Sequence, residues 1–393
     1  MKLAGVRVID LSLFLPGPHL TQLMADHGAD VIKVEPANGG EPNRDIGLKR
    51  DAFSVFFSNT HRGKRSIQLN LKSDAGREIL MRLAESADVM IEAFRPGVVK
   101  RLKVDYDAVR LRAPQIVYCS ISAFGQDGPY VNKPAHDLAT QAYAGILSVN
   151  ADQNDAPVVP GMANADMLAA LYGLSGILMA LLRRQQTGVG DYLDIAMMDS
   201  LVASMPNNLG PVFAEHRPPA PKDERSWGGN AMYRIYATKD GRHLALGGAE
   251  MHFAANFLNK LGRPDLIPYC EPPPGPTQEP VRQFFIETFK TRTLEEWMVW
   301  CADVDMAVAP VNNLREAMDD PQLRAREMVV VDERGWEHLG TPLKFRNEPG
   351  RQSFALPGLG EHTDELLREV GYDDGAVSAA RLEHAFDLPG KTS

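Results

Sequence analysis

The carboxylate of Asp166 is the side chain best placed for chemistry in this 393-residue sequence. It follows the small-residue segment Gly161-Met-Ala-Asn-Ala and opens an apolar run, 165–184, with the composition of a helix. Aspartate at the start of a helix is a favoured N-cap, because its oxygen accepts from the first-turn amides. Those amides and the helix dipole would also keep the carboxylate ionised. Because an ionised aspartate can act as a covalent nucleophile, the position suits a cap, an acyl acceptor or both.

The pair His136-Asp137 is a second candidate, since it follows a predicted strand, 116–121, and a turn-rich segment, 124–129. Histidine titrates near neutrality, so His136 could move a proton or donate to a carbonyl oxygen. The alternative is a surface histidine or one with a satisfied partner in the core. Glu250 follows a Gly-Gly-Ala segment after a predicted hairpin, and taken alone it indicates a solvated glutamate or a cap.

Arginines lie beside predicted strands, with Arg62 before one of them and Arg95 and Arg101 after another. These side chains either form solvated faces or hold phosphates, with which guanidinium groups pair bidentately. Pro16-Gly17-Pro18, between the first predicted strand and helix, would let the backbone approach a ligand closely.

The common signatures of nucleotide, metal and hydrolase sites are missing from the sequence. It contains no GxGxxG after the first strand, no GxxxxGK[ST], no HExxH, no EF-hand pattern and no GxSxG. Dehydrogenases, kinases, zinc peptidases and ordinary serine hydrolases are therefore disfavoured, and we expect no metal and no permanently bound cofactor.

Charge and cysteine content narrow the partners and the compartment. The net charge is −9, without a dominant basic region, so nucleic acid and anionic membranes are disfavoured as partners. The 3 cysteines form no CxxC pair, which excludes a disulfide framework and suits a reducing compartment. No signal-like apolar region follows Met1, and the longest uncharged stretch, 167–182, is shorter than the roughly 18 residues of a membrane span. We expect a cytoplasmic protein.

Short β-branched runs alternate with helical patterns through the first half of the chain, which predicts a parallel sheet with helices on both faces. Strands are expected at 6–11, 31–35, 66–71, 89–94, 116–121 and 192–197, and helices at 18–27, 74–86 and 165–184. The helix at 165–184 is apolar around most of its circumference, which predicts a central, buried helix. Ligands bind such sheets beyond the carboxyl ends of the strands, which is where His136 is expected.

The composition predicts two domains. Residues 1–204 would form the N-terminal part of a large α/β domain, followed by 205–227, a linker rich in proline and charge. Residues 228–326 would form a smaller α+β domain that begins with a hairpin around Lys239-Asp-Gly. Segment 327–393 would return to the large domain.

Motifs along most of the chain resemble those of the class III CoA-transferase family, which includes formyl-CoA transferase, carnitine CoA-transferase and α-methylacyl-CoA racemase. Each motif is weak alone, but their order and spacing together are specific. They are Pro16-Gly17-Pro18, the segments 24–35 and 62–72, Phe94-Arg-Pro-Gly97, Phe124-Gly-Gln126, His136-Asp137, Gly161 to Asp166, 190–199 and 359–364.

The resemblance implies a Rossmann-like parallel-sheet domain built from both chain ends, a small middle domain and an interlocked homodimer. It also implies an acyl-CoA:carboxylate CoA-transferase in which Asp166 forms an aspartyl anhydride and then an aspartyl-CoA thioester. His136 would assist by hydrogen bonding, and backbone amides near Gly247 and Gly248 would stabilise oxyanions. With Asp166, His136 and Glu250 as catalytic residues, the residues expected to bind CoA are Phe14, Leu15, Arg62, Leu69, Phe94, Arg101, Ala135 and Asp137.

The same resemblance leaves an alternative open. Formyl-CoA transferase has tyrosine where this chain has His136, whereas the racemase branch has His-Asp there and a glutamate matching Glu250. An α-methylacyl-CoA racemase would use His136 and Asp166 for 1,1-proton transfer, with Glu250 orienting His136. The segment Lys344-Phe-Arg is more transferase-like, and we favour the transferase. A non-catalytic CoA-binding protein is the third hypothesis.

Substrate identity is not readable from the sequence. Family members place arginine directly after the glutamate of the second strand, whereas this chain has Pro36, so Arg44 or Arg62 would have to substitute in contacting CoA. Arg225 and Arg234 are candidates to pair with the acceptor carboxylate.

Overall fold

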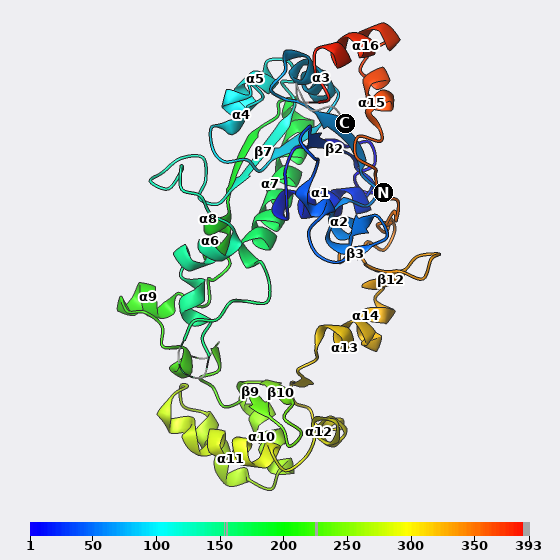
Figure 1. Cartoon of the computed structure of the whole chain (residues 1–393). Helices are drawn as coiled ribbons and strands as arrows, with labels where there is room; N and C mark the ends of the chain where they lie inside the picture. Colours follow the sequence, from blue (N-terminus) through cyan, green and yellow to red (C-terminus); the bar gives the residue numbers. More distant parts are fainter. Residues whose placement is uncertain (153, 155, 225–226, 388–393) are drawn as a thin grey trace. The chain divides into compact units, whose positions relative to one another are not determined.

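The computed structural model describes residues 1–152, 154, 156–224 and 227–387, which divide into two compact units (Figure 1). Unit 1 comprises Met1–Ala144, Gly161–Ser204 and Pro321–Ser393, and unit 2 comprises Gly145–Pro160 and Met205–Asp320. Segment 205–227, expected as a linker, belongs to unit 2 and contains helix α9 (Gly210–Glu215). Arg225, within that segment, lies outside the described residues.

Unit 1 is built on a six-stranded parallel sheet with the order β5-β2-β1-β6-β7-β8. Its strands are β1 (Arg7–Asp10), β2 (Asp30–Pro36), β5 (Arg65–Leu69), β6 (Val89–Glu92), β7 (Val117–Ser122) and β8 (Tyr192–Ala196). The six expected strands are confirmed, with ends shifted by a few residues at most. Numbered along the chain, this order is 3-2-1-4-5-6, that of the Rossmann fold, and it reverses between β1 and β6.

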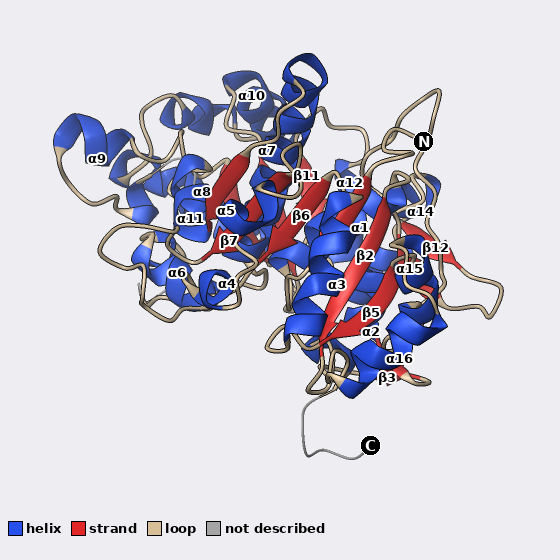
Figure 2. Ribbon diagram, turned by 90° about the horizontal axis from the view of Figure 1, so that it is seen from above, coloured by secondary structure: helices blue, strands red, loops and turns tan. Residues whose placement is uncertain are grey.

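Helices cover both faces of this sheet (Figure 2). The helices of unit 1 are α1 (Pro16–Asp26), α2 (Val55–His61), α3 (Asp74–Glu85), α4 (Val98–Arg101), α5 (Tyr106–Arg110), α6 (Asp137–Tyr143), α7 (Asn164–Thr187), α8 (Met197–Ala203), α14 (Pro321–Ala325), α15 (Thr363–Glu369) and α16 (Asp374–Leu382). Short two-stranded pairs are formed by β3 (Lys49–Arg50) with β4 (Phe53–Ser54), and by β12 (Val329–Val331) with β13 (Glu337–Leu339).

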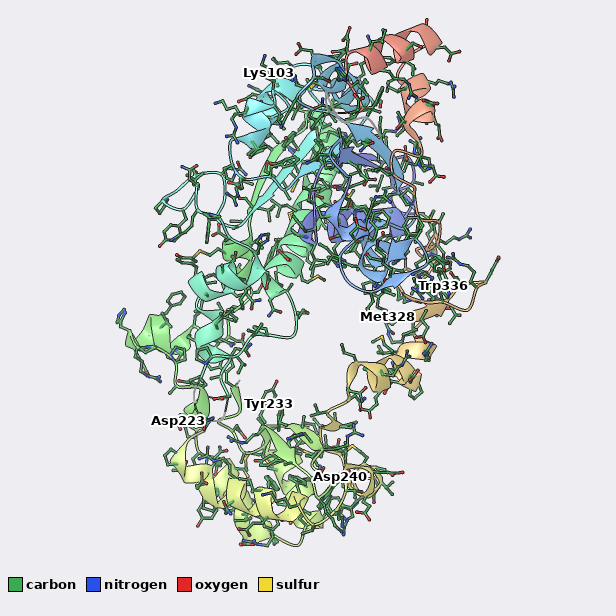
Figure 3. The ribbon with its side chains drawn as sticks, viewed as in Figure 1. Lys103, Asp223, Tyr233, Asp240, Met328 and Trp336 are labelled. Carbon is green, nitrogen blue, oxygen red and sulfur yellow. The ribbon has the colours of Figure 1, made fainter. Side chains whose placement is uncertain are left out.

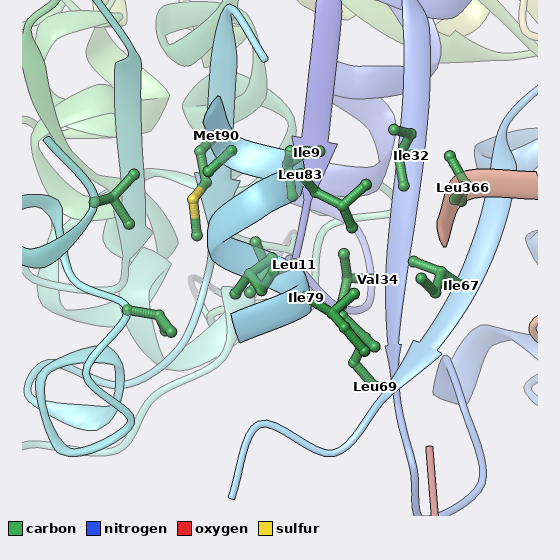
Figure 4. Packing of buried hydrophobic residues seen from close by; sticks show 14 of the residues in the cluster. Ile9, Leu11, Ile32, Val34, Ile67, Leu69, Ile79, Leu83, Met90 and Leu366 are labelled. Atoms are coloured by element: carbon green, nitrogen blue, oxygen red, sulfur yellow. The ribbon is translucent and has the colours of Figure 1, made fainter. Parts of the chain in front are cut away.

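Alternate residues of β1, β2, β6 and β7 face two separate cores. Ile9, Ile32 and Ile67 pack with Leu83 of α3 and Leu366 of α15 on one face (Figure 4). Val8, Val31 and Val117 pack with α1 and α7 on the other. Because a strand exposes successive side chains to opposite faces, the nearly continuous apolar runs are what a sheet covered on both sides requires.

Helix α7 differs from the expected central, buried helix, because only one of its faces is buried. Ala169, Gly173 and Ile177 face α1 and the sheet, and a Cβ on Gly173 would lie 2.7 Å from Leu20 Cδ1. The opposite face is also apolar but exposed, with Met179 70% exposed and Leu182 64% exposed. Among the described residues, α7 is the one helix whose length and composition would suit a membrane span, and core helices share those properties. A helix that is apolar around most of its circumference is therefore not necessarily buried within its own chain.

Unit 2 contains an antiparallel sheet ordered β11-β10-β9, formed by β9 (Tyr233–Ala237), β10 (His243–Gly247) and β11 (Val308–Pro310). The expected hairpin is confirmed, and Figure 3 labels Tyr233 in β9 and Asp240 in the turn. Its helices are α9, α10 (Met251–Lys260), α11 (Glu279–Phe289), α12 (Leu294–Cys301) and α13 (Leu314–Asp319). Phe257, Phe285, Phe289 and Trp297 form the centre of its own hydrophobic core.

Candidate active site

A cavity of about 360 Å³ opens in unit 1 beyond the carboxyl ends of β1, β6 and β7. The sheet order reverses between β1 and β6, and ligands of open α/β sheets bind at such a reversal. The cavity is lined by Leu13, Phe14, Pro16, Ala93, Phe94, Arg95, Pro96, Ile121, Ser122, Ala123, Phe124, Gly125, Val131, Lys133, Ala135, His136, Asp166 and Met197.

Asp166 is half-buried in the wall of this cavity. It lies in the first turn of α7, two residues inside the helix, and the N-cap position is Ala163, which makes no side-chain cap. Asp166 is therefore not the cap of α7. Burial raises the pKa of Asp166 to about 7, and the nearby charge of Asp137 adds to the rise. The expectation that amides and the helix dipole hold this carboxyl ionised is therefore wrong.

Asp137 supplies the missing cap of α7 from the first turn of α6. The Ala165 N–H donates to Asp137 Oδ1 at 2.8 Å, and the Asp166 N–H lies 3.4 Å from the same oxygen. Gln141 Nε2 donates to the other carboxylate oxygen at 2.6 Å. A carboxylate at a helix N-terminus is stabilised by the amide donors and the helix dipole. Asp137, expected to bind CoA, therefore holds the backbone that carries Asp166.

His136 and Phe14 lie on the same cavity wall as neighbours. His136 is exposed and directly precedes α6, and its ring meets the Phe14 ring edge-on at 6.0 Å between centroids. Phe14 has a φ of 64°, in the left-handed region that a bulky residue rarely adopts. Leu15, the residue before α1, is half-buried next to it. The structure thus brings together His136, Asp166, Phe14, Phe94 and Ala135 in one cavity.

Two cationic side chains lie in the cavity wall: Arg95, already a candidate to hold phosphates, and Lys133, which was not predicted as a site residue. Arg95 follows β6, and Lys133 precedes His136 by three positions. The Lys133 ammonium lies 4.7 Å from the Tyr130 ring centroid and 4.5 Å from that of Tyr143. Its position three residues before the His-Asp pair could have identified Lys133 as a site residue from the sequence.

A second cavity, of about 170 Å³, lies beside the first and shares Leu13 and Phe94 with it. Leu69 lines it, together with residues at the ends of β2 and β5. Its walls are mainly apolar apart from Glu35, Asn38, Asn70 and Lys72. Lys72 is exposed and was missed as a site residue, although it ends the motif 62–72.

The two arginines expected to substitute at Pro36 are already engaged. Arg62 is buried, and its Nη2 donates to Asp26 Oδ2 at 2.7 Å, so the prediction that it binds CoA is not supported. Arg44 pairs with Glu35 through both Nε and Nη2, at 2.8 and 2.6 Å. Arg101 is exposed on α4, and its Nη1 lies 3.5 Å from the point where a Cβ on Gly97 would be. Its predicted contact with CoA stays a prediction.

Gly17 is required by the packing of the chain, and the approach of a ligand to its backbone stays a prediction. A Cβ at this position would collide with the Ser12 side chain, so only glycine lets α1 begin this close to the loop after β1.

Glu250 and Arg234 belong to unit 2. Glu250 is exposed at the residue before α10, and Arg234 donates to the Gly228 carbonyl at 2.8 Å. Their relation to Asp166 stays a prediction, as does that of the Gly247-Gly248 amides. Within the described residues, no cluster of three or more His, Cys, Asp or Glu side chains could hold a metal ion.

A buried carboxylate, Glu92, and an exposed one, Asp194, hold the loops that form the rim of the first cavity. Glu92, at the end of β6, accepts from the Phe94 N–H at 2.7 Å, and Asp194 in β8 accepts from the Gln126 N–H at 2.8 Å. Burial raises the pKa of Glu92 to about 7, although hydrogen bonds from Ser120 and the Phe94 amide oppose the rise.

Comparison with known proteins gives a consistent result along the chain. The model of CoA-transferase family III matches residues 3–363. A succinate–glutarate CoA-transferase of Agrobacterium fabrum is 31% identical, over 94% of this chain and 95% of its own. A succinyl-CoA:mesaconate CoA-transferase of Haloarcula marismortui is also 31% identical, over 95% and 97% respectively.

Two further likenesses agree with these. A formyl-CoA:oxalate CoA-transferase of Escherichia coli O157:H7 is 30% identical over 98% of this chain and 99% of its own. The crystal structure of a CAIB/BAIF family protein from Brucella suis superposes with a TM-score of 0.83 at 28% identity, covering 94% of this chain and 99% of that one.

Proposed function

We propose that this chain, which belongs to CoA-transferase family III, transfers coenzyme A from an acyl-CoA to a carboxylate acceptor with Asp166 as covalent nucleophile. Its relatives are named CoA-transferases, and the chain is a transferase that acts on CoA thioesters. The observation that carries the proposal is a half-buried carboxylate in the wall of a cavity at the sheet reversal.

The chemistry needs only the carboxylate and the two substrates. An Asp166 oxygen attacks the thioester carbon, the C–S bond breaks, and CoA leaves as a thiolate from an aspartyl-acyl anhydride. The thiolate attacks the Asp166 carbonyl carbon, which releases the donor carboxylate and leaves an aspartyl-CoA thioester. The acceptor carboxylate attacks that same carbon and expels the thiolate, which then attacks the acceptor's acyl carbon. This last step gives the new acyl-CoA and restores Asp166.

The ionisation of Asp166 sets when the first step can occur. A carboxyl with a pKa of about 7 is about half ionised at neutral pH, and its anion is less solvated and more nucleophilic than a surface carboxylate. His136 lines the same cavity and assists by donating a hydrogen bond to the acyl oxygen or to Asp166.

The two cavities suggest how the CoA arm lies. The shared walls, Leu13 and Phe94, are apolar and suit the pantetheine chain, and Leu69 continues this surface into the second cavity. Lys72 and Lys133, with Arg95, place positive charge along this path for the phosphates. We propose them for the phosphate contact for which Arg62 and Arg101 were also candidates.

The assembly and location we propose are a homodimer in the cytoplasm. The exposed apolar face of α7 supports a partner, because apolar side chains gathered on one face of a helix are costly in water. All three cysteines are free and buried, which is compatible with a reducing compartment.

A panel of acyl-CoA donors and carboxylate acceptors tests the function. Succinyl-CoA is the first donor to use, because several relatives are named for it. We expect formation of the acceptor's CoA thioester, measured by chromatography.

Parallel incubation of 2-methylacyl-CoA in deuterated water tests the racemase alternative, which is favoured by the presence of His136 and Asp166 in the same cavity. If deuterium appears at the α-carbon and no CoA is transferred, the transferase activity is rejected and the racemase activity is supported.

A further inference from the structure

The loop after β1 is held at both backbone groups of Phe14. The Phe14 N–H donates to Glu41 Oε1 at 3.0 Å, and the Phe14 carbonyl accepts from Asn43 Nδ2. This residue has the positive φ described above, a backbone conformation that is unfavourable for a non-glycine residue. Its conformation therefore depends on the partners that hold it.

Glu41 belongs to a buried group of ion-paired side chains next to this loop. Its Oε2 lies 3.2 Å from the Lys33 ammonium, which also donates to the Ser12 carbonyl and lies 3.5 Å from Asp10. Lys64 lies 3.2 Å from Asp10 on the other side. All of these side chains are buried. Burial alone would raise the pKa of Asp10, but Lys33 and Lys64 outweigh it and hold that pKa below its ordinary value.

Burying this many charges is not a route to stability, because desolvation offsets most of the attraction between them. What the network does provide is fixed donors and acceptors at both Ser12 and Phe14. The Ser12 N–H donates to Asp10 Oδ1 at 2.9 Å, so the loop is held at its start and at its tip.

We propose that Glu41 is a positioning residue of the acyl-CoA site, which holds Phe14 against His136 and so shapes the cavity that contains Asp166. The inference rests on the proposed function. Glutamate is required because Oε1 serves the Phe14 amide while Oε2 serves Lys33. Glutamine offers one acceptor for these two donors, so one contact must be lost.

The test compares Glu41→Gln and Asn43→Ala with Asp26→Asn. Asp26 is a matched control, because it is a buried carboxylate ion-paired with Arg62 and its backbone lies at the other end of α1. Affinity for a thioether analogue of an acyl-CoA is measured by calorimetry, with hydrogen exchange of the segment 10–16 and thermal unfolding measured alongside.

We expect both loop variants to bind the analogue at least about tenfold more weakly, with faster exchange of the Phe14 amide. Asp26→Asn should lose stability and keep its affinity. If wild type binds the analogue and Glu41→Gln binds it equally well, or if Asp26→Asn loses as much affinity as Glu41→Gln, the positioning role is wrong. A wild type that does not bind the analogue at all would instead overturn the proposed function.

Discussion

Two neighbouring carboxylates, Asp137 and Asp166, have different hydrogen-bond partners. Asp137 accepts the amides at the start of α7 and the Gln141 side chain. Asp166 has burial without such donors, so its pKa rises to about 7. One carboxylate thus orients the backbone and the other is left to react, a division of roles that environment sets and residue type does not.

The rate of the acyl-transfer step should rise with pH through about 7, because only ionised Asp166 attacks the thioester. Asp137→Asn should move this limb to lower pH by roughly one unit, since it removes a negative charge and keeps an amide oxygen for the Ala165 N–H. The other charged or titratable groups in the cavity wall, Arg95, Lys133 and His136, are unchanged. The measurement is the single-turnover rate as a function of pH. If the pH at which the rate rises is the same in Asp137→Asn as in wild type, the rise reports the ionisation of a group other than Asp166.

Asp166→Asn should lower CoA transfer by at least about a thousandfold and leave acyl-CoA affinity nearly unchanged, because it removes the nucleophile and preserves the shape of the wall. Asp74→Asn is the matched control, an aspartate in the first turn of α3. Steady-state kinetics and calorimetry measure the two quantities, and turnover retained in Asp166→Asn would reject the assignment.

At the scale of the elements, carboxylates of the strands connect the sheet to its loops. Asp10, Glu92 and Asp194 each accept a backbone N–H from the loop at the cavity rim. Periodicity predicted the strands, because a doubly covered sheet imposes long apolar runs. It could not predict that Asp137 would cap α7 or that Arg62 would pair with Asp26, since each pair joins residues far apart in the sequence.

Glu92→Gln should flatten the dependence of stability on pH. The pKa of Glu92 is raised from 4.5 to about 7 by folding, so the folded protein loses stability as pH rises between those values. The loss amounts to about 3 kcal/mol by linkage. Denaturant unfolding at pH 4.5 and pH 8 measures it in both proteins. The same difference in wild type and variant would mean that Glu92 ionises normally.

At the scale of the whole molecule, the motifs along the chain identified the family, and the match to residues 3–363 confirms it. The expected Rossmann-like sheet is present in unit 1, with its reversal next to the cavity. How much of α7 its own chain buries could not be predicted, because an apolar helix face can be covered by the same chain or by a second copy.

Sedimentation equilibrium should give twice the mass of one chain. Met179→Glu combined with Leu182→Glu should weaken the assembly, because both side chains lie on the exposed apolar face of α7. Leu382→Glu on α16, which replaces a similarly exposed apolar side chain on another helix, is the matched control. A wild type that sediments as a single chain would exclude the homodimer.

The covalent role of Asp166 is tested most directly by trapping. The protein is incubated with the preferred acyl-CoA without acceptor, quenched in acid, treated with hydroxylamine or borohydride, and digested for mass spectrometry. We expect the hydroxamate or the reduced side chain at Asp166 alone, and neither in Asp166→Asn. Label on a different residue, or full turnover with no label at Asp166, would contradict the account.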